Sequence, residues 1–181
     1  MTTDPVHVAL LLAAQQLAQV AIARGALQRA LTLAQDYTVL RRQGARMIVR
    51  HDAVALLLAD METAAETLDA LLRDAGRAHM AGAAPLRRAA RAVALRREAL
   101  PLLSRAANAA MQLHGGSGYM RDTGIEHILR DINTLALLGG SASELALLAT
   151  GLSTHSSACQ AALPEDICNE TTHLPGHLPA T

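Results

Sequence analysis

Phenylalanine, tryptophan and lysine are absent from this 181-residue chain, and aromatic side chains make up only 1% of it. Hydrophobic residues nevertheless make up 51%, so the core must consist of Leu, Ala, Val, Ile and Met. Side chains of this kind favour closely packed helices over a sheet. The 16 basic residues, all arginine, balance 16 acidic ones. We therefore expect an all-α protein without the charge excess that attracts nucleic acid or an anionic membrane.

Cysteine is confined to Cys159 and Cys168, so a disulfide framework for the body of the protein is excluded. No stretch holds the roughly 20 uninterrupted apolar residues that a membrane span needs. The apolar run at 8–14 follows Asp4 and Pro5, where a signal peptide would carry basic residues. These features predict a cytoplasmic protein that does not enter a membrane.

Apolar residues recur at helical spacing through most of the chain and predict an antiparallel four-helix bundle with an additional short C-terminal helix. The predicted helices span residues 7–40, 48–75, 86–113, 125–138 and 142–151. Gly25 lies inside the first helix, where it costs about 1 kcal/mol relative to alanine unless another backbone packs against it. Pro101 should kink or restart the third helix. The arginines of that helix, among them Arg96 and Arg97, are expected mostly on its solvated face.

Helical periodicity ends near residue 152, after which Ser, Thr, Pro and His dominate. We assign residues 1–152 to the bundle and residues 153–181 to a flexible polar tail. The tail carries His and Cys residues, but no C-x-x-C or H-x₃-H unit is present, so no metal site is predicted.

Two glycine-rich turns give the chain its most informative pattern. A long helical pattern stops at Gly115-Gly116, and the next one stops at Gly139-Gly140. Glycines this dense end helices and allow a backbone to approach another group closely. The full pattern is Gln112-Leu113-His114-Gly115-Gly116-Ser117-Gly118-Tyr119, then Arg130-Asp131, then Gly139-Gly140-Ser141. It resembles the C-terminal helical domain of the acyl-CoA dehydrogenases, and the likeness covers residues 14–151. The Arg130-Asp131 pair matches a common family motif, whose implied role is an ion pair that holds the fourth helix.

This resemblance implies an FAD site at a subunit interface. The implied cofactor-binding residues are Arg41, Gln112, Gly115, Gly116 and Ser141. Arg41 matches the arginine that contacts the flavin diphosphate, and a guanidinium fork suits diphosphate oxygens. One departure is clear, because Gly44 occupies the position of a phenylalanine that packs beside the flavin in the family.

The catalytic base is where the sequence departs most from the family. Removing an α-proton from an acyl thioester requires a carboxylate facing the α-carbon. The two positions at which family members carry this glutamate fall on Gly139 and on Gln15, with Gln16 beside it. Glutamine is not a useful proton acceptor near neutral pH. The catalytic residue is therefore unassigned, with Glu144 and Glu126 as weak candidates or an acid from another chain.

The likeness covers one family domain and leaves the N-terminal helical and middle β-domains unmatched. The leading interpretation is the carboxyl half of a split flavoenzyme that oxidises the Cα–Cβ bond of an acyl thioester, carried on coenzyme A or a carrier protein. A second chain would supply the unmatched domains, and the bundle itself would form a homo-oligomer. Two alternatives stay open. The bundle is a flavin-independent enzyme for proton transfer, dehydration or cyclisation, or it is a non-catalytic oligomerisation scaffold.

Overall fold

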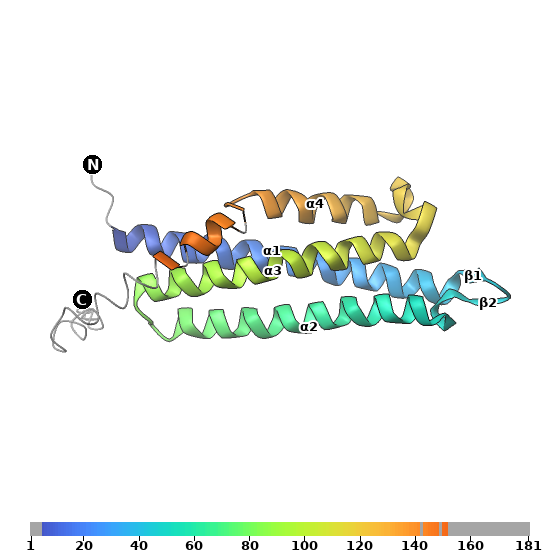
Figure 1. The fold of residues 1–181 in the computed structure, drawn as a ribbon, viewed down its shortest axis with the longest axis horizontal. Coiled ribbons are helices and arrows are strands. Elements are labelled where there is room, and N and C mark those ends of the chain that lie inside the picture. The colour runs from blue at the N-terminus through green and yellow to red at the C-terminus, as the bar shows by residue number, and fades with distance from the viewer. Residues whose placement is uncertain (1–4, 142, 149, 152–181) are drawn as a thin grey trace, which may run out of the picture.

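The computed structural model describes residues 5–141, 143–148 and 150–151. Four long helices account for most of this part of the chain: α1 (Pro5–Leu40), α2 (Asp52–Met80), α3 (Pro85–His114) and α4 (Ile125–Leu137). Figure 1 shows an elongated up-and-down bundle, in which α1 and α3 lie between α2 and α4. The predicted all-α fold is confirmed. Residues 143–148 and 150–151 are helical, where the short last helix was expected, and the tail at 153–181 lies outside the described residues.

Small side chains let the two central helices pack closely. Ala9 and Ala13 of α1 form a buried cluster with Ala89 and Ala92 of α3. The larger part of the core is built from aliphatic and methionine side chains of all four long helices. Its fully buried large members include Val20, Leu27, Met61, Leu68 and Ile132. A chain without Phe or Trp thus fills its core with close helix contacts instead of large rings.

The predicted turn at 41–46 is a small antiparallel hairpin, formed by β1 (Arg42–Gln43) and β2 (Arg46–Met47). The two residues between the strands, Gly44 and Ala45, have φ of 57° and 66°. Positive φ at both central positions is the type I′ geometry, whose twist matches that of paired strands. A short 3₁₀ helix, η1 (Ile48–Arg50), then leads into α2.

The end of α2 and the effect of Pro101 differ from the sequence prediction. The helix α2 continues through Gly76 to Met80, and Gly82 with φ 71° lies in the short turn before α3. The helix α3 runs without a break through Pro101. Pro101 is exposed, so water can satisfy the carbonyl group that loses its helical hydrogen bond there.

The chain between α3 and α4 folds into two 3₁₀ turns, η2 (Gly115–Tyr119) and η3 (Arg121–Thr123). Gly124, with φ 71°, precedes the first residue of α4. This glycine turn and the β1–β2 hairpin lie at the same end of the bundle, so residues about 70 positions apart in sequence become neighbours (Figure 1).

Within the described residues, one helix is long and apolar enough to cross a membrane by length and composition alone. It comprises Val6–Leu40 of α1, with a mean hydropathy of 1.6 in its most apolar window. A core helix of a soluble protein passes the same test, and α1 packs against α2, α3 and α4. Only 28% of that window is buried, however, so much of the apolar surface of α1 is uncovered by this chain.

Candidate functional site

A pocket of about 700 Å³ opens at the hairpin end of the bundle. It lies between the end of α1, the start of α2 and the glycine turn after α3. Four of the five residues that the sequence assigns to cofactor binding line it: Arg41, Gln112, Gly115 and Gly116. The fold therefore brings together residues that the sequence places in two separate motifs.

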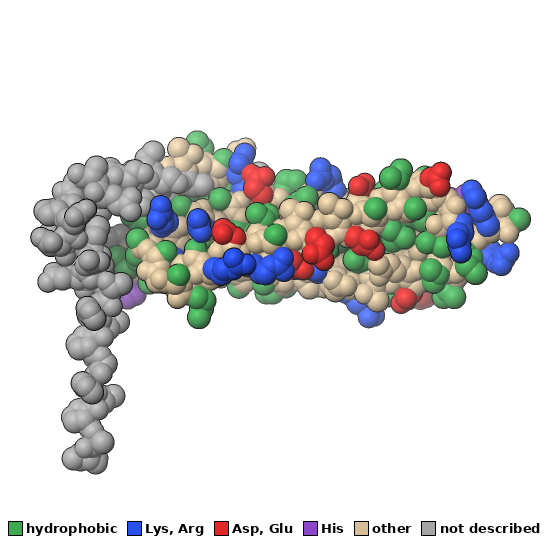
Figure 2. All heavy atoms as spheres, turned by 90° about the horizontal axis from the view of Figure 1, so that it is seen from below, with side chains coloured by type: hydrophobic (Ala, Val, Ile, Leu, Met, Phe, Trp, Pro, Cys, Tyr) green, Lys and Arg blue, Asp and Glu red, His purple; other side chains and the backbone are tan. Residues whose placement is uncertain are grey.

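Arg41 directly follows the last turn of α1, where its backbone N–H donates to the carbonyl of Tyr37 at 2.9 Å. Its side chain is exposed and forms no ion pair with the described residues. Three more exposed arginines, Arg42, Arg46 and Arg50, follow in the hairpin segment. Figure 2 shows basic side chains at this end of the molecule. A guanidinium with uncommitted donors beside a pocket is suited to the oxygens of a phosphate or diphosphate.

The glycines of the turn have three different reasons to be glycine. A Cβ on Gly118 would lie 2.7 Å from Met111 Sδ and 2.9 Å from the Met111 carbonyl, so the fold itself requires glycine. Gly115 adopts φ 55°, which disfavours other residues. Gly116 has no positive φ, and a Cβ there would meet no described atom within 4 Å. The fold itself therefore does not require glycine at residue 116.

Aromatic and imidazole rings line the same pocket. The rings of Tyr37 and His114 stack with centroids 4.5 Å apart. His114 is buried, and its Nδ1 lies 2.8 Å from the carbonyl oxygen of Ala110. A carbonyl only accepts, so Nδ1 carries the proton. His114 therefore packs at the end of α3 against the ring of Tyr37. His51, the residue directly before α2, supplies a third ring to the lining.

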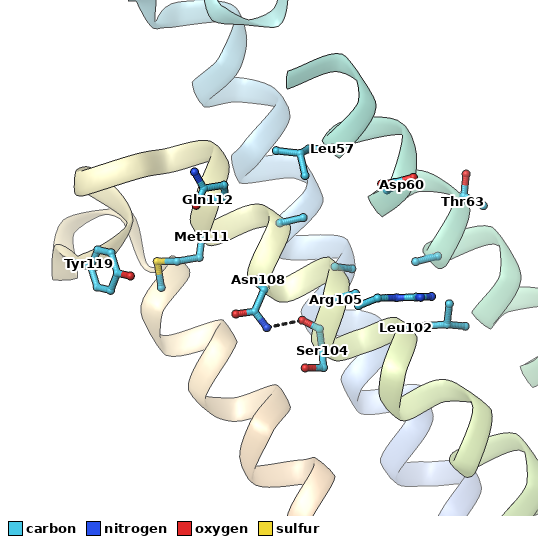
Figure 3. Close-up of a pocket in the computed structure, with 13 residues that line it drawn as sticks. Leu57, Asp60, Thr63, Leu102, Ser104, Arg105, Asn108, Met111, Gln112 and Tyr119 are labelled. Carbon is cyan, nitrogen blue, oxygen red and sulfur yellow. Dashed lines mark hydrogen bonds between the residues drawn. The ribbon is translucent and has the colours of Figure 1, made fainter. Parts of the chain in front are cut away.

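A second pocket of about 700 Å³ adjoins the first along the α2–α3 face and shares Leu57 and Gln112 with it. Figure 3 shows Gln112 and Tyr119 at one end and Arg105 further along α3, with Asp60 across on α2. Asn108 donates to the carbonyl of Ser104 at 2.8 Å, so its amide is already used within α3.

Ser141, the fifth predicted cofactor residue, lies elsewhere. The neighbouring Gly139 lies beside Gln16 of α1, which is 21 residues from Tyr37 on the same helix, or about 30 Å at 1.5 Å per residue. The Ser141 N–H donates to Glu144 Oε2 at 2.7 Å, and the Glu144 N–H donates to Ser141 Oγ at 3.3 Å. This reciprocal pair is a capping box at the start of a helix.

The same capping interaction explains the electrostatics of Glu144. The hydrogen bond from the Ser141 backbone, and then that from its side chain, lower the pKa of the Glu144 carboxyl. A carboxylate that is stabilised in its ionised form is a weaker proton acceptor. The structure therefore makes Glu144 a helix-capping residue and a poor candidate for the catalytic base.

Gly139, one of the two positions at which the family carries its base, lies against α1. A Cβ on Gly139 would lie 3.4 Å from Gln16 Nε2 and 3.2 Å from Gln19 Oε1. The residue that faces Gly139 is the buried Gln16, whereas Gln15, the position reached by counting, is exposed. The three described atoms nearest to this Cβ position include no carboxylate oxygen. The third of these atoms belongs to the guanidinium of Arg96.

Arg96 is the exception to the solvated arginine face expected on α3, because only 1% of it is exposed, whereas Arg87, Arg91 and Arg97 are exposed. Its Nη2 donates to the carbonyl of Leu135 at 2.8 Å, and the guanidinium also bonds the carbonyl of Leu138 and the side chain of Gln19. Arg96 thus binds the carbonyl end of α4, where the helix dipole is negative. Burial lowers the pKa of the Arg96 guanidinium through desolvation. Nε of Arg96 and Oε1 of Gln16 are buried without a hydrogen-bond partner among the described residues.

Glu126 is committed to local ion pairs. It bonds Arg130, one turn later in α4, and lies 3.1 Å from His127 Nε2. The ion pair expected from the Arg130-Asp131 motif is therefore made by Arg130 with Glu126, inside α4, and Asp131 is exposed. It does not tie α4 to another helix, a role that Arg96 fulfils.

Residues 8–149 match a sequence model of the acyl-CoA dehydrogenase C-terminal domain. The chain belongs to the acyl-CoA dehydrogenase family. Curated relatives of this family include an acyl-CoA dehydrogenase of Bacillus subtilis, 34% identical over 119 residues, which cover 66% of this chain and 31% of the relative. A 3-sulfinopropanoyl-CoA desulfinase of Paraburkholderia xenovorans is 31% identical over 137 residues, which cover 73% of this chain and 33% of that protein.

Solved structures agree on the fold. Butyryl-CoA dehydrogenase from Megasphaera elsdenii aligns with a TM-score of 0.74 at 23% identity, over 80% of this chain and 37% of that one. An acyl-CoA dehydrogenase from Slackia heliotrinireducens aligns with a TM-score of 0.74 at 21% identity, over 87% and 41%. This acyl-CoA dehydrogenase C-terminal domain therefore spans about a third of the length of the curated relatives that it matches.

Sequence reasoning missed two residues of this family member. The burial of Arg96 could have been predicted, because this residue falls on the apolar stripe of α3 at helical spacing from Ala92 and Ala99. His51 carried none, since its neighbours in the pocket come from other elements. Both residues lie next to a glycine at which the sequence departs from the family motif: Arg96 next to Gly139, and His51 next to Gly44.

Proposed function

We propose that this chain is the carboxyl-terminal half of a split acyl-CoA dehydrogenase-like flavoenzyme, which oxidises the Cα–Cβ bond of an acyl thioester together with a second polypeptide. The observation that carries the proposal is the convergence of Arg41, Gln112, Gly115 and Gly116 on one pocket. Arg41 offers free donors for the diphosphate of FAD, and Gly116 leaves room for a ligand against the backbone.

The spacing of the implied flavin residues supports a site built from two chains. Ser141 lies about 30 Å along the bundle from the Arg41 pocket, judged from the rise of α1. One copy of the domain would therefore contribute the Arg41 end to one flavin and the Ser141 end to another. FAD, when bound, would supply the hydride acceptor, while Arg41 and the glycine turn would hold its diphosphate part.

The exposed apolar surface of the domain also supports association with partner chains. Large apolar side chains are exposed along α1 and near the end of α4, including Leu11 at 70%, Ile22 at 61% and Leu137 at 83%. Apolar surface costs about 25 cal/mol per Å² in water, so these faces favour association. We propose a homo-oligomer formed through α3, α4 and the glycine turn, with the second polypeptide covering α1. Light scattering that gives a monodisperse monomer at micromolar concentration would contradict the homo-oligomer.

The second candidate is a flavin-independent enzyme on the same bundle. The observation that favours it is Arg96, a buried cation next to Gly139, the position where the family base would stand. A fixed positive charge stabilises negative charge and does not remove a proton. One family relative is named as a desulfinase acting on an acyl-CoA, so its named reaction is not a dehydrogenation.

The deciding experiment is production of this chain with a polypeptide that carries the N-terminal and middle domains of the family, followed by visible absorption spectroscopy. We expect the chain alone to be colourless or faintly yellow and the complex to carry flavin. Arg41→Ala should abolish flavin uptake by the complex. Arg73→Ala, which removes an arginine of α2 outside the pocket, should leave uptake unchanged.

The outcomes separate the two candidates. Stoichiometric FAD on the chain alone would overturn the requirement for a partner. A complex that forms but never carries flavin, under oxidising or reducing conditions, would overturn the flavoenzyme and favour the flavin-independent reaction.

A further inference from the structure

The turn between α2 and α3 carries an excess of positive charge. Within residues 70–95, five arginines stand against one acidic residue, Asp74. Four of these arginines are exposed and Arg88 is half-buried. Together they form the α2–α3 arginine patch, which comprises Arg73, Arg77, Arg87, Arg88 and Arg91. Figure 2 shows basic side chains toward this end of the molecule, which is opposite to the hairpin end.

One ion pair joins the two helices across the patch. Arg91 Nη1 of α3 lies 3.5 Å from Asp74 Oδ2 of α2, and both side chains are more than half exposed. Asp74 directly follows Arg73 and precedes Arg77 by three residues, so the exposed arginines of α2 lie near those of α3. The patch is therefore one surface built from two helices.

Most of the guanidinium groups of the patch are not committed to other side chains. Those of Arg73, Arg77 and Arg87 form no ion pair or hydrogen bond within the described residues, and Arg88 donates to the carbonyl of Ala83. Arg73 and Arg77 are four residues apart on α2, and Arg87 and Arg91 are four apart on α3. Like charges at this spacing destabilise a helix, so the patch favours a negatively charged occupant.

The start of α3 adds to the positive field of the patch. The N-cap residue Ala84 makes no side-chain hydrogen bond to the N–H groups of the first turn, and that turn contains no acidic residue. A helix N-terminus carries a partial positive charge, which Asp or Glu offsets in many helices. This charge is offset here by no side chain of the first turn.

The C-terminal part of the same chain carries the opposite charge. Residues 152–181, which lie outside the described residues, contain Glu165, Asp166 and Glu170 and no arginine. The last described residues, 150–151, lie toward the end of the bundle at which α2 ends and α3 begins (Figure 1). The roughly 14 residues from 151 to 165 can span up to about 45 Å, against a helix diameter of about 10 Å. The patch is therefore within reach of the acidic residues.

We propose that the acidic segment 165–170 binds the α2–α3 arginine patch of its own chain. Carboxylates are the groups that arginine binds through two parallel hydrogen bonds. A single exposed ion pair contributes little, but a tether within one chain raises the effective concentration of the acidic segment. The contact would hold the C-terminal segment across the turn between α2 and α3. It uses no residue of the Arg41 pocket, so it is independent of the proposed flavin function.

The test uses the full chain with a nitroxide spin label on Cys168, which lies inside the acidic segment. Cys159→Ser removes the second of the two cysteines, so the label has one site. We expect the label to broaden the NMR amide signals of Arg77 and Arg87 and to leave those of the hairpin, at the opposite end, unchanged. The broadening should be largely lost at about 1 M salt, where the Debye length is about 3 Å.

Charge variants separate binding from the effect of the tether alone. Combining Glu165→Gln, Asp166→Asn and Glu170→Gln keeps the length of the segment but removes its charge, and Arg77→Gln with Arg87→Gln weakens the patch. Both sets should lose most of the broadening. Arg121→Gln, which removes an exposed arginine beyond the other end of α3, should retain it. Equal broadening in the uncharged segment would show that the tether alone places the label there and would overturn the proposal.

A mixed sample separates binding within one chain from binding between copies. Isotope-labelled chain without a nitroxide is mixed with nitroxide-labelled chain that carries no isotope. Unbroadened signals in this mixture, together with broadening in the directly labelled chain, support the proposal. Broadening of the patch in the mixture would place the acidic segment on a neighbouring copy and contradict it. Unbroadened patch signals in the directly labelled chain would overturn it as well.

Discussion

The guanidinium carbon of Arg96 lies 3.7 Å from the point that a Cβ on Gly139 would occupy. A position that carries a carboxylate in family members is therefore next to a buried cation in this chain. A carboxylate placed there would pair with Arg96 and be held in its ionised form, which makes it a poor proton acceptor. Position 139 thus lacks a suitable base for two reasons. Residue 139 is a glycine, and the neighbouring Arg96 would keep a carboxylate at this position ionised.

Adding a side chain at residue 139 should destabilise the fold. Gly139 has φ 97°, and its Cβ would meet Gln19 Oε1 at 3.2 Å. We expect Gly139→Ala to cost about 1–2 kcal/mol and to lower Tm by about 3–8 °C in thermal unfolding. Gly25→Ala is the matched control, because Gly25 is exposed within α1 and its Cβ would meet nothing within 4 Å. That change should raise stability by about 0.5–1 kcal/mol.

Removing the Arg96 charge should release the end of α4. Arg96→Met fills similar space but leaves the carbonyls of Leu135 and Leu138 without their donor. We expect a loss of about 2–4 kcal/mol in unfolding free energy, together with faster amide exchange at the end of α4. Arg97→Ala removes the next arginine, whose half-exposed side chain pairs with Glu98. It should change stability by less than about 0.5 kcal/mol, and an equal effect of the two variants would contradict the role of Arg96.

The capping box predicts an acid-sensitive helix end. The hydrogen bonds from Ser141 lower the folded-state pKa of Glu144. A depressed pKa means that the cap stabilises the protein above the unfolded-state value, about 4.3, and that this contribution is lost as pH falls through the lower folded-state value. Amide exchange at Ser141 and Glu144 should therefore accelerate below about pH 4, beyond its intrinsic pH dependence. Glu144→Gln should remove this extra acid response, and its persistence in the variant would assign it to another group.

Two neighbouring glycines should respond oppositely to alanine. Gly118→Ala brings a Cβ within 2.9 Å of the Met111 carbonyl, so we expect a loss of about 2 kcal/mol or more in chemical denaturation. Gly116→Ala meets no described atom, so stability should stay within about 0.5 kcal/mol. It should nevertheless weaken ADP or FMN binding in titration calorimetry, because the new methyl group covers backbone at the pocket. Unchanged binding in Gly116→Ala would remove that residue from the site.

Local patterns were sufficient to predict the helices, whereas the candidate site residues came from the family likeness. Apolar spacing identified α1 to α4, and Gly115-Gly116 and Gly139-Gly140 marked two of the turns correctly. Gly76 was wrongly given a turn, because the helical residues around it outweigh the cost of about 1 kcal/mol of one glycine. The convergence of Arg41 with Gln112 followed from the family likeness.

Local sequence patterns could not predict which residues surround Gly139 and Gly44, the two glycines at which the sequence departs from the family. The contacts of Arg96 with α4 and of His51 with Gly44 depend on how helices and loops meet in space. Arg96 was predicted to be solvent-exposed because it is charged, although its position on the apolar stripe of α3 indicated burial. A buried arginine is uncommon, but here carbonyl groups at a helix end stabilise it.

The distance of about 30 Å between the Arg41 pocket and Ser141 has a genetic consequence for a site shared by two copies. In a mixed pair, one copy carries Arg41→Ala and the other carries Ser141→Ala. One of its two shared sites then has both defects, and the other has both residues intact. Two inactive alleles would therefore complement each other when expressed together, with up to half of the sites restored in each mixed pair. Alleles altered at Arg41 and Gly116, which belong to the same end, would not complement.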